Sequence, residues 1–247
     1  MTGPRRISWS QHRSWLDHHW LPGQHVSVVA VTGGGKSYLL REGLLPLWRD
    51  YRALVIDVKG DDPTLAGVGQ VVEGLPSTER TQGRGQPPEH GPRWYRLVVP
   101  EWDFAGARKR GRSGLEHAQQ VTGETLHAAY RMGDWLIVLD EARAVTDHVS
   151  TFGLGLQGVV ENIWQRGRSR RVTLVACTQQ PLWMPGSFYS QPSYLYLGRM
   201  LEPPTAHFRE IGGDTRVIRE TLPQLERWEF LFVERDTARM SIVQVGR

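Results

Sequence analysis

The chain has 247 residues, of which 39% are hydrophobic and 23% are charged, so it can bury a sizeable core as a globular protein. Its formal net charge of +4 tolerates a polyanionic partner without requiring one. The single cysteine, Cys177, excludes an internal disulfide framework, and no apolar run approaches the ~20 residues that cross a bilayer. We expect no secretory signal and no transmembrane segment.

The spacing of apolar residues predicts alternating helices and strands. Helices are expected over 9–20, 36–48, 115–132, 156–166, 203–211 and 214–222, and strands over 26–31, 53–58, 94–99, 135–139, 172–177 and 194–197. Residues 230–233 and 240–245 are expected to form a closing hairpin. This alternation predicts an α/β fold with a mostly parallel central sheet flanked by helices. Loop insertions are expected around 77–92 and 105–114, because glycine, proline and basic residues interrupt the pattern there.

A glycine-rich segment between the first strand and the next helix has the pattern of a phosphate-binding loop. It reads Ala30-Val31-Thr32-Gly33-Gly34-Gly35-Lys36-Ser37, with Ala30 in place of the first glycine of the consensus. Lys36 supplies a charge for the β- and γ-phosphates of a nucleotide, and Ser37 offers a hydroxyl to Mg²⁺. The residues expected to bind the nucleotide are Thr32, Gly33, Gly34, Gly35, Lys36, Ser37 and Tyr38. The alternative is a glycine-rich turn with an incidental Lys-Ser pair.

Two carboxylates follow the apolar run at 135–139. A continuous apolar run is typical of a strand buried on both faces, and Asp140 and Glu141 come directly after it. We expect Asp140 to hold Mg²⁺ and Glu141 to act as the general base that polarises the attacking water. The alternative is a buried strand that ends in a solvated acidic turn.

Two other strands end in polar residues. The strand at 53–58 carries Asp57 and ends next to Lys59, which could touch phosphate, face a neighbouring subunit or sit in a solvated turn. The strand at 172–177 is followed by Thr178 and Gln179, whose amide could contact both water and the γ-phosphate or merely cap the strand. Because ligands gather at the carboxyl ends of strands in open α/β sheets, both ends are candidates for the site.

Arginines cluster in two places. Four lie between residues 166 and 171, where one could act in trans on a neighbouring subunit, or all could form a basic surface turn. Arg108, Lys109, Arg110 and Arg112 form a basic loop that could line a DNA pore, meet a recruiting protein or remain solvated. The histidines at 12, 18, 19 and 25 lack a zinc-binding spacing, so we expect structural or surface roles for them. The segment 20–25 is a candidate for packing near a nucleotide base.

The order of these motifs resembles the FtsK/HerA superfamily of DNA-pumping ATPases, over about residues 20–235. The resemblance implies a RecA-like (ASCE) P-loop NTPase domain over 26–247, preceded by a helical lead-in over 1–25, and a ring, usually a hexamer, with ATP sites between subunits. It also implies that Lys36, Glu141, Gln179 and Arg168 are catalytic and that Ser37 and Asp140 hold Mg²⁺. Arg166 is a weaker match than Arg168 for the arginine that acts in trans. The chain shows no segment that matches a large amino-terminal barrel or a winged-helix DNA reader.

The leading hypothesis is therefore an ATP-hydrolysing, Mg²⁺-dependent ring motor that translocates double-stranded DNA without sequence specificity, of the compact viral or mobile-element type. Such a motor acts in genome packaging, conjugative transfer or segregation and is expected in the cytoplasm or associated with a virion. Two alternatives stay open: an ATPase that powers protein secretion or phage extrusion, and a nucleotide-gated assembly module. DNA-stimulated ATP hydrolysis separates the first hypothesis from the other two.

Overall fold

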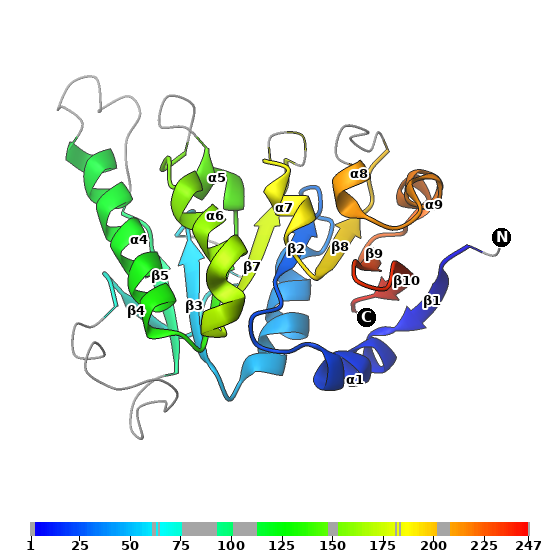
Figure 1. Cartoon of the computed structure of the whole chain (residues 1–247), viewed down its shortest axis with the longest axis horizontal. Helices are drawn as coiled ribbons and strands as arrows, with labels where there is room; N and C mark the ends of the chain where they lie inside the picture. The colour runs from blue at the N-terminus through cyan, green and yellow to red at the C-terminus, as the bar shows by residue number, and fades with distance from the viewer. Residues whose placement is uncertain are drawn as a thin grey trace.

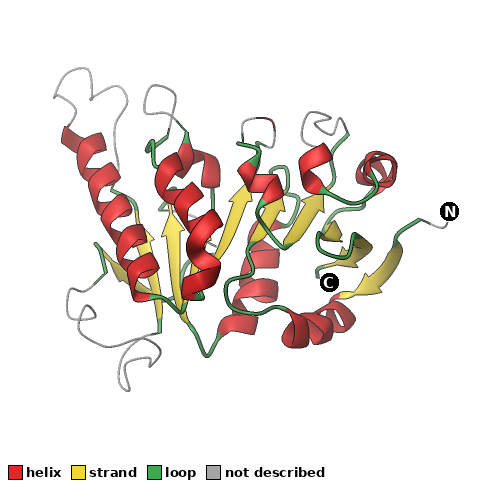
Figure 2. Cartoon of the chain, in the orientation of Figure 1, coloured by secondary structure: helices red, strands yellow, loops and turns green. Residues whose placement is uncertain are grey.

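The computed structural model describes residues 3–60, 63, 65–75, 93–100, 113–147, 153–180, 182, 184–201 and 208–246. The expected loop at 77–92 and the basic loop at 108–112 both lie outside the described residues. The described strands form one sheet in the order β1-β10-β9-β8-β2-β7-β6-β3-β5-β4, with helices packed on both faces (Figure 1, Figure 2).

The sheet is mostly parallel. Its parallel strands include β2 (Val26–Val29), β3 (Arg52–Asp57), β4 (Gln70–Val72), β5 (Trp94–Val98), β6 (Trp135–Leu139), β7 (Thr173–Thr178) and β8 (Tyr194–Gly198). β9 (Glu229–Glu234) and β10 (Arg239–Gln244) form the expected antiparallel hairpin, and β9 alone among the described strands runs against the rest. The carboxyl ends of the other strands therefore meet at one edge of the sheet, where an open α/β fold places its ligands.

The helices agree with most of the expected ranges. They are α1 (Trp9–His19), α4 (Ser113–Met132), α5 (Ala142–Thr146), α6 (Gln157–Arg166), α7 (Ser187–Ser190), α8 (Phe208–Ile211) and α9 (Thr215–Thr221). The sequence did not predict α5, α7 or the short strand β4, because each is too brief to show a period. No described helix is long and apolar enough to cross a membrane.

The helix after the phosphate loop is continuous but irregular, which the sequence did not predict. It begins as α2 (Lys36–Tyr38), continues as a π-helix over Leu39–Leu44 and ends as a 3-10 helix over Leu45–Trp48. Pro46 has no backbone N–H and so removes one of the regular i→i−4 hydrogen bonds. The N–H of Leu45 instead donates to the carbonyl of Leu40, five residues back.

Strand β6 shows why the central strands are apolar throughout. Leu136 and Val138 pack into the core cluster that also holds the helix after the phosphate loop and Leu16 of α1. Trp135, Ile137 and Leu139 pack into the cluster beneath α4 and α6 on the opposite face. Both faces of the strand are covered, so each of its five residues is buried.

The amino-terminal segment differs from the expected helical lead-in. Residues Arg5–Ser8 form the strand β1, which pairs in parallel with β10 at the end of the sheet. Arg6 also forms an ion pair with the buried carboxylate of Glu229, with Nε and Oε1 2.9 Å apart. The segment before residue 26 is therefore part of the same sheet rather than only a helix that precedes it.

Candidate functional site

The phosphate loop, residues 30–37, connects β2 to α2 at the carboxyl edge of the sheet. Gly33 and Gly35 have φ angles of +75° and +92°, a region that residues with a Cβ rarely adopt. The N–H of Gly34 donates to the carbonyl of Val31 at 2.9 Å, and a Cβ on Gly34 would lie 2.9 Å from that same oxygen. The loop therefore requires its three glycines, as a tight phosphate cradle does.

Ala30, which replaces the first glycine of the consensus, is accommodated by the strands beside it. Its side chain is buried, and its N–H donates to the carbonyl of Thr178 at 3.1 Å. A Cβ on Gly198 in the neighbouring strand would lie 3.0 Å from the Cβ of Ala30. Gly198 thus supplies the space that the methyl group of Ala30 occupies, and the departure from the consensus does not distort the loop.

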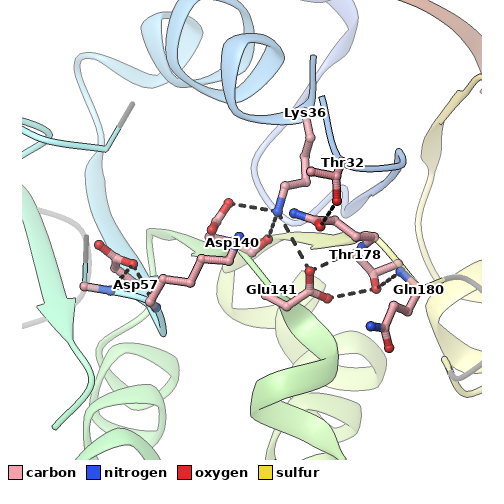
Figure 3. Close-up of polar contacts among 10 residues, drawn as sticks. Thr32, Lys36, Asp57, Asp140, Glu141, Thr178 and Gln180 are labelled. Carbon is pink, nitrogen blue, oxygen red and sulfur yellow. Dashed lines mark hydrogen bonds and ion pairs between the residues drawn. The ribbon is translucent and has the colours of Figure 1, made fainter. Parts of the chain in front are cut away.

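Lys36 joins the phosphate loop to the end of β6 (Figure 3). Its side chain is only 5% exposed, and Nζ donates to the backbone carbonyl of Asp140 at 2.5 Å. The same atom lies 3.1 Å from Oδ1 of Asp140 and 4.0 Å from Oε2 of Glu141. Burial lowers the pKa of Lys36, but its neighbours Cys177, Asp140 and Glu141 raise it more, so the net pKa is raised and the ammonium stays charged.

The carboxylate of Asp140 fits a divalent cation. The residue is fully buried, and its Oδ2 accepts no hydrogen bond from the part of the chain that the structure describes. A buried carboxylate oxygen without a donor suits Mg²⁺, which protein sites typically hold through one or two carboxylates plus waters and substrate phosphates. Ser37, two residues past Gly35, offers the hydroxyl that completes such a site. The described residues contain no cluster of three His, Cys, Asp or Glu side chains that would form an all-protein cage.

Glu141 is fixed by the end of β7, the strand that lies between β2 and β6. The hydroxyl of Thr178 donates to Oε1 of Glu141 at 2.9 Å, and the N–H of Gln179 donates to Oε2 at 3.3 Å. The Glu141 side chain remains 15% exposed, so water can reach a carboxylate that is held in one orientation. This geometry suits a general base.

Gln179 connects β7 to the phosphate loop. The hydroxyl of Thr32 donates to Oε1 of Gln179 at 2.7 Å. The structure therefore brings together the phosphate loop, Asp140, Glu141 and Gln179, which come from three neighbouring strands. The sequence did not predict the hydrogen bond from the Thr178 hydroxyl to Glu141. The signal that could have indicated it is the polar Thr178 at the end of a largely apolar strand.

Asp57 caps its own turn at the same edge. Its Oδ1 accepts hydrogen bonds from the N–H groups of Lys59 and Gly60, at 3.2 and 2.9 Å. Arg96 of β5 lies 3.7 Å from its Oδ2. Lys59 itself is exposed beside the site. Asp57 therefore serves the local turn, and the role of Lys59 stays a prediction.

The four arginines at 166–171 divide into two pairs. Arg170 donates to the carbonyl of Arg131 and lies over the ring of Tyr130, and Arg171 pairs with Asp134 at 2.6 Å. Arg166 and Arg168 are exposed, and no hydrogen bond or ion pair of their side chains occurs among the described residues. Arg166 and Arg168 can therefore meet another molecule without breaking a contact within the described part of the chain, whereas Arg170 and Arg171 already have partners.

Arg168 lies at the amino end of β7, opposite the phosphate loop. It belongs to the 3-10 helix Gly167–Arg170, which precedes β7, and a Cβ on Gly23 would lie 2.8 Å from its Cα. The six residues of β7 span roughly 20 Å at ~3.3 Å per residue. Arg168 therefore cannot serve the phosphate loop of its own subunit, and a role in hydrolysis requires a neighbour.

The expectation that segment 20–25 packs near a base is wrong for the same reason. This segment precedes β2 and lies at the amino edge, where His25 accepts a hydrogen bond from the N–H of Leu174 at 3.0 Å. Burial lowers the pKa of His25 to about 4 and that of His12 to about 3. Both are neutral core residues, whereas His18 and His19 are exposed, which confirms the expected structural and surface roles.

No protein-family profile and no curated protein matches the sequence. Solved structures do match the fold. The genome packaging NTPase B204 from Sulfolobus turreted icosahedral virus 2 aligns with 92% of this chain and 98% of its own, with a TM-score of 0.61 and 15% identity. The pCW3 conjugation coupling protein TcpA aligns with 93% of this chain and 60% of its own, with a TM-score of 0.51 and 17% identity.

The cytoplasmic domain of the Type VII secretion ATPase EccC from Thermomonospora curvata aligns with 92% of this chain and 26% of its own, with a TM-score of 0.50 and 17% identity. The fold is thus that of RecA-like P-loop NTPases, which confirms the expected fold class. This is also the fold that the resemblance to FtsK/HerA-type ATPases implied.

Proposed function

We propose that this chain is an ATP-hydrolysing motor that works as a hexameric ring on double-stranded DNA. The observation that carries the proposal is the buried ammonium of Lys36, which contacts both Asp140 and Glu141 at the meeting point of the phosphate loop, β6 and β7. A positive charge, a metal-binding carboxylate and an oriented second carboxylate are the groups that phosphoryl transfer to water needs.

Each group has one task in this proposal. The N–H groups of Gly33 and Gly35 and the charge of Lys36 bind the phosphates of ATP, whereas the N–H of Gly34 holds the loop through the carbonyl of Val31. Ser37 and Asp140 would hold Mg²⁺, which would neutralise charge on the phosphate oxygens. Glu141 accepts a proton from the attacking water, and Gln179 senses the γ-phosphate.

The similar structures favour DNA as the polymer that is moved. B204 is a genome packaging NTPase, also solved in complex with ATP-gammaS, and TcpA is a conjugation coupling protein. This chain matches nearly the full length of B204, which supports a compact packaging motor located in the cytoplasm or with a virion. EccC is a secretion ATPase, which keeps transport of protein as the second candidate.

The exposed Arg168 supports the ring. An arginine at the far end of β7 can reach a nucleotide only if a second copy presents its phosphate loop to it. We propose ATP sites between subunits, with Arg168 as the trans residue and Arg166 beside it. The domain over 26–247 would form the motor, and 1–25 would add β1 and α1 to it.

The experiment that tests this function is the steady-state ATPase rate with and without long duplex DNA, beside a sizing measurement in ATP. We expect DNA to raise the rate and ATP to favour the ring. Replacement of Arg108, Lys109, Arg110 and Arg112 by Gln should spare basal hydrolysis and flatten the salt dependence of DNA binding. The logarithm of the DNA association constant falls against the logarithm of the salt concentration with a slope of about −0.9 for each phosphate that is neutralised. Hydrolysis that DNA does not change would favour the secretion or assembly alternatives.

A further inference from the structure

An aromatic surface lies against the phosphate loop on the side away from the carboxylates. In the sheet order, β8 and β9 lie on one side of β2, whereas β7 and β6 lie on the other. Gly198 at the carboxyl end of β8 pairs with Phe230 at the start of β9. The turn that precedes β9, and with it Trp228, is therefore at the phosphate-loop edge.

The indole of Trp228 lies directly on the loop. A Cβ on Gly35 would lie 2.7 Å from Cδ1 of Trp228, so only glycine leaves room for the ring. The ring of Tyr38 is nearly parallel to that of Trp228, with an interplanar angle of 12° and centroids 6.0 Å apart. Tyr38 directly follows Ser37 and is 40% exposed. Two parallel rings thus border the loop, and one of them faces solvent.

The backbone of Trp228 is held in an unusual conformation. Its φ is +67°, which a bulky residue rarely adopts, and such strain persists only where the surroundings enforce it. The carbonyl of Trp228 accepts a hydrogen bond from the N–H of Val245 at 2.9 Å. The buried carboxylate of Glu229 accepts from the N–H of Glu226 and pairs with Arg6 of β1. Residues of this kind concentrate at ligand clamps.

We propose that Tyr38 and Trp228 form the stacking site for the purine base of the nucleotide, a proposal that rests on the function above. Lys36 and Asp140 mark the end of the loop where the γ-phosphate and metal lie. A bound nucleotide extends from its γ-phosphate in the opposite direction, so its base would lie beyond Ser37, beside Tyr38 and Trp228. The guanidinium of Arg227 lies 5.1 Å from the centroid of the Trp228 ring and helps to fix its plane. A stacked base is recognised by its face, so adenine and guanine nucleotides both suit the site.

The test compares the affinities for ATPγS and for inorganic tripolyphosphate, which has phosphates but no base. Calorimetry would use the wild type, Trp228→Ala, Trp228→Phe and, as a matched control, Trp94→Phe at the opposite edge of the sheet. Trp228→Ala should weaken ATPγS binding about 5- to 150-fold and leave tripolyphosphate binding unchanged. Trp228→Phe keeps a smaller stacking ring, so it should recover most of the ATPγS affinity that Trp228→Ala loses. Trp94→Phe lies outside the site and should bind ATPγS as the wild type does.

Other outcomes separate the two proposals. If Trp228→Ala weakens both ligands equally, Trp228 only supports the loop, and the stacking proposal is wrong. Equal affinity of the wild type for ATPγS and tripolyphosphate would also overturn it, while the nucleotide function would survive. A wild type that binds neither ligand would overturn the proposed function and the stacking site together.

Discussion

The hydroxyl of Thr178 donates a hydrogen bond to Oε1 of Glu141 at 2.9 Å, across the neighbouring strands β7 and β6. Thr178 is fully buried, and its Oγ1 also accepts a hydrogen bond from the N–H of Gln180 at 3.0 Å. The hydroxyl is therefore oriented both as a donor and as an acceptor, and it fixes the orientation of the Glu141 carboxylate. Thr178 is a positioning residue for the proposed base.

Thr178→Val should lower kcat for ATP hydrolysis roughly 10- to 100-fold, because a hydrogen bond to a charged group is worth about 1.5–3 kcal/mol. KM for ATP should change little, since Thr178 does not contact the phosphate loop through its side chain. Thr178→Ser keeps the hydroxyl and should restore most of the rate. A valine variant with the wild-type kcat, or one altered only in KM, would contradict the positioning role.

The ion pair between Lys36 and Asp140 makes a prediction about stability without nucleotide. Lys36→Met leaves a buried carboxylate without its partner and should lower the free energy of unfolding by about 3–5 kcal/mol. Adding Asp140→Asn removes the charge and should recover much of the loss. Because the pKa of Lys36 is raised, its contribution is fully present below the unfolded value of 10.5 and is lost only as pH rises through the folded pKa. Urea unfolding at pH 7 measures this change in the free energy of unfolding. Equal stability of Lys36→Met and the wild type would contradict a stabilising ion pair between Lys36 and Asp140.

Arg168→Ala should bind ATP almost normally and fail to hydrolyse it, since an arginine supplied in trans contributes roughly 10³–10⁵ in rate in GTPases. Mixing this variant with Lys36→Ala subunits should restore some hydrolysis, because one mixed interface combines an intact loop with an intact arginine. Arg171→Ala is the control, since Arg171 already pairs with Asp134 within the subunit. No recovery in demonstrably exchanging subunits would assign Arg168 a structural role.

The buried histidines predict a loss of stability in mild acid. Burial lowers the pKa of His25 to about 4 and of His12 to about 3, so both are neutral in the fold yet take up a proton near pH 6.5 when unfolded. Their contribution is present above pH 6.5 and is lost as pH falls toward 4, at up to about 1.4 kcal/mol per pH unit for each. His25→Asn should flatten the fall of unfolding free energy between pH 6.5 and 4. An unchanged slope would argue against a neutral buried His25.

The central strands and the carboxylates that follow them could be predicted because the signal lies in consecutive residues of the sequence. Residues 135–139 are buried on both faces, which leaves an unbroken apolar run that ends at Asp140. The strand β1 was not predictable, because Arg5–Ser8 show no apolar alternation and depend on pairing with β10, more than 200 residues later. Trp228 likewise reaches the phosphate loop only through the position of β9 in the sheet. No nearby residue in the sequence signals that approach.

The proposed site itself is tested most directly by Glu141→Gln, with ATP binding and ATP hydrolysis measured on the same preparation. The variant keeps the size of the side chain and loses the base. We predict an ATP affinity equal to that of the wild type and a hydrolysis rate lower by roughly 10²–10⁴-fold. Normal hydrolysis by Glu141→Gln, together with an inactive Asp140→Asn, would contradict the account and place the base elsewhere.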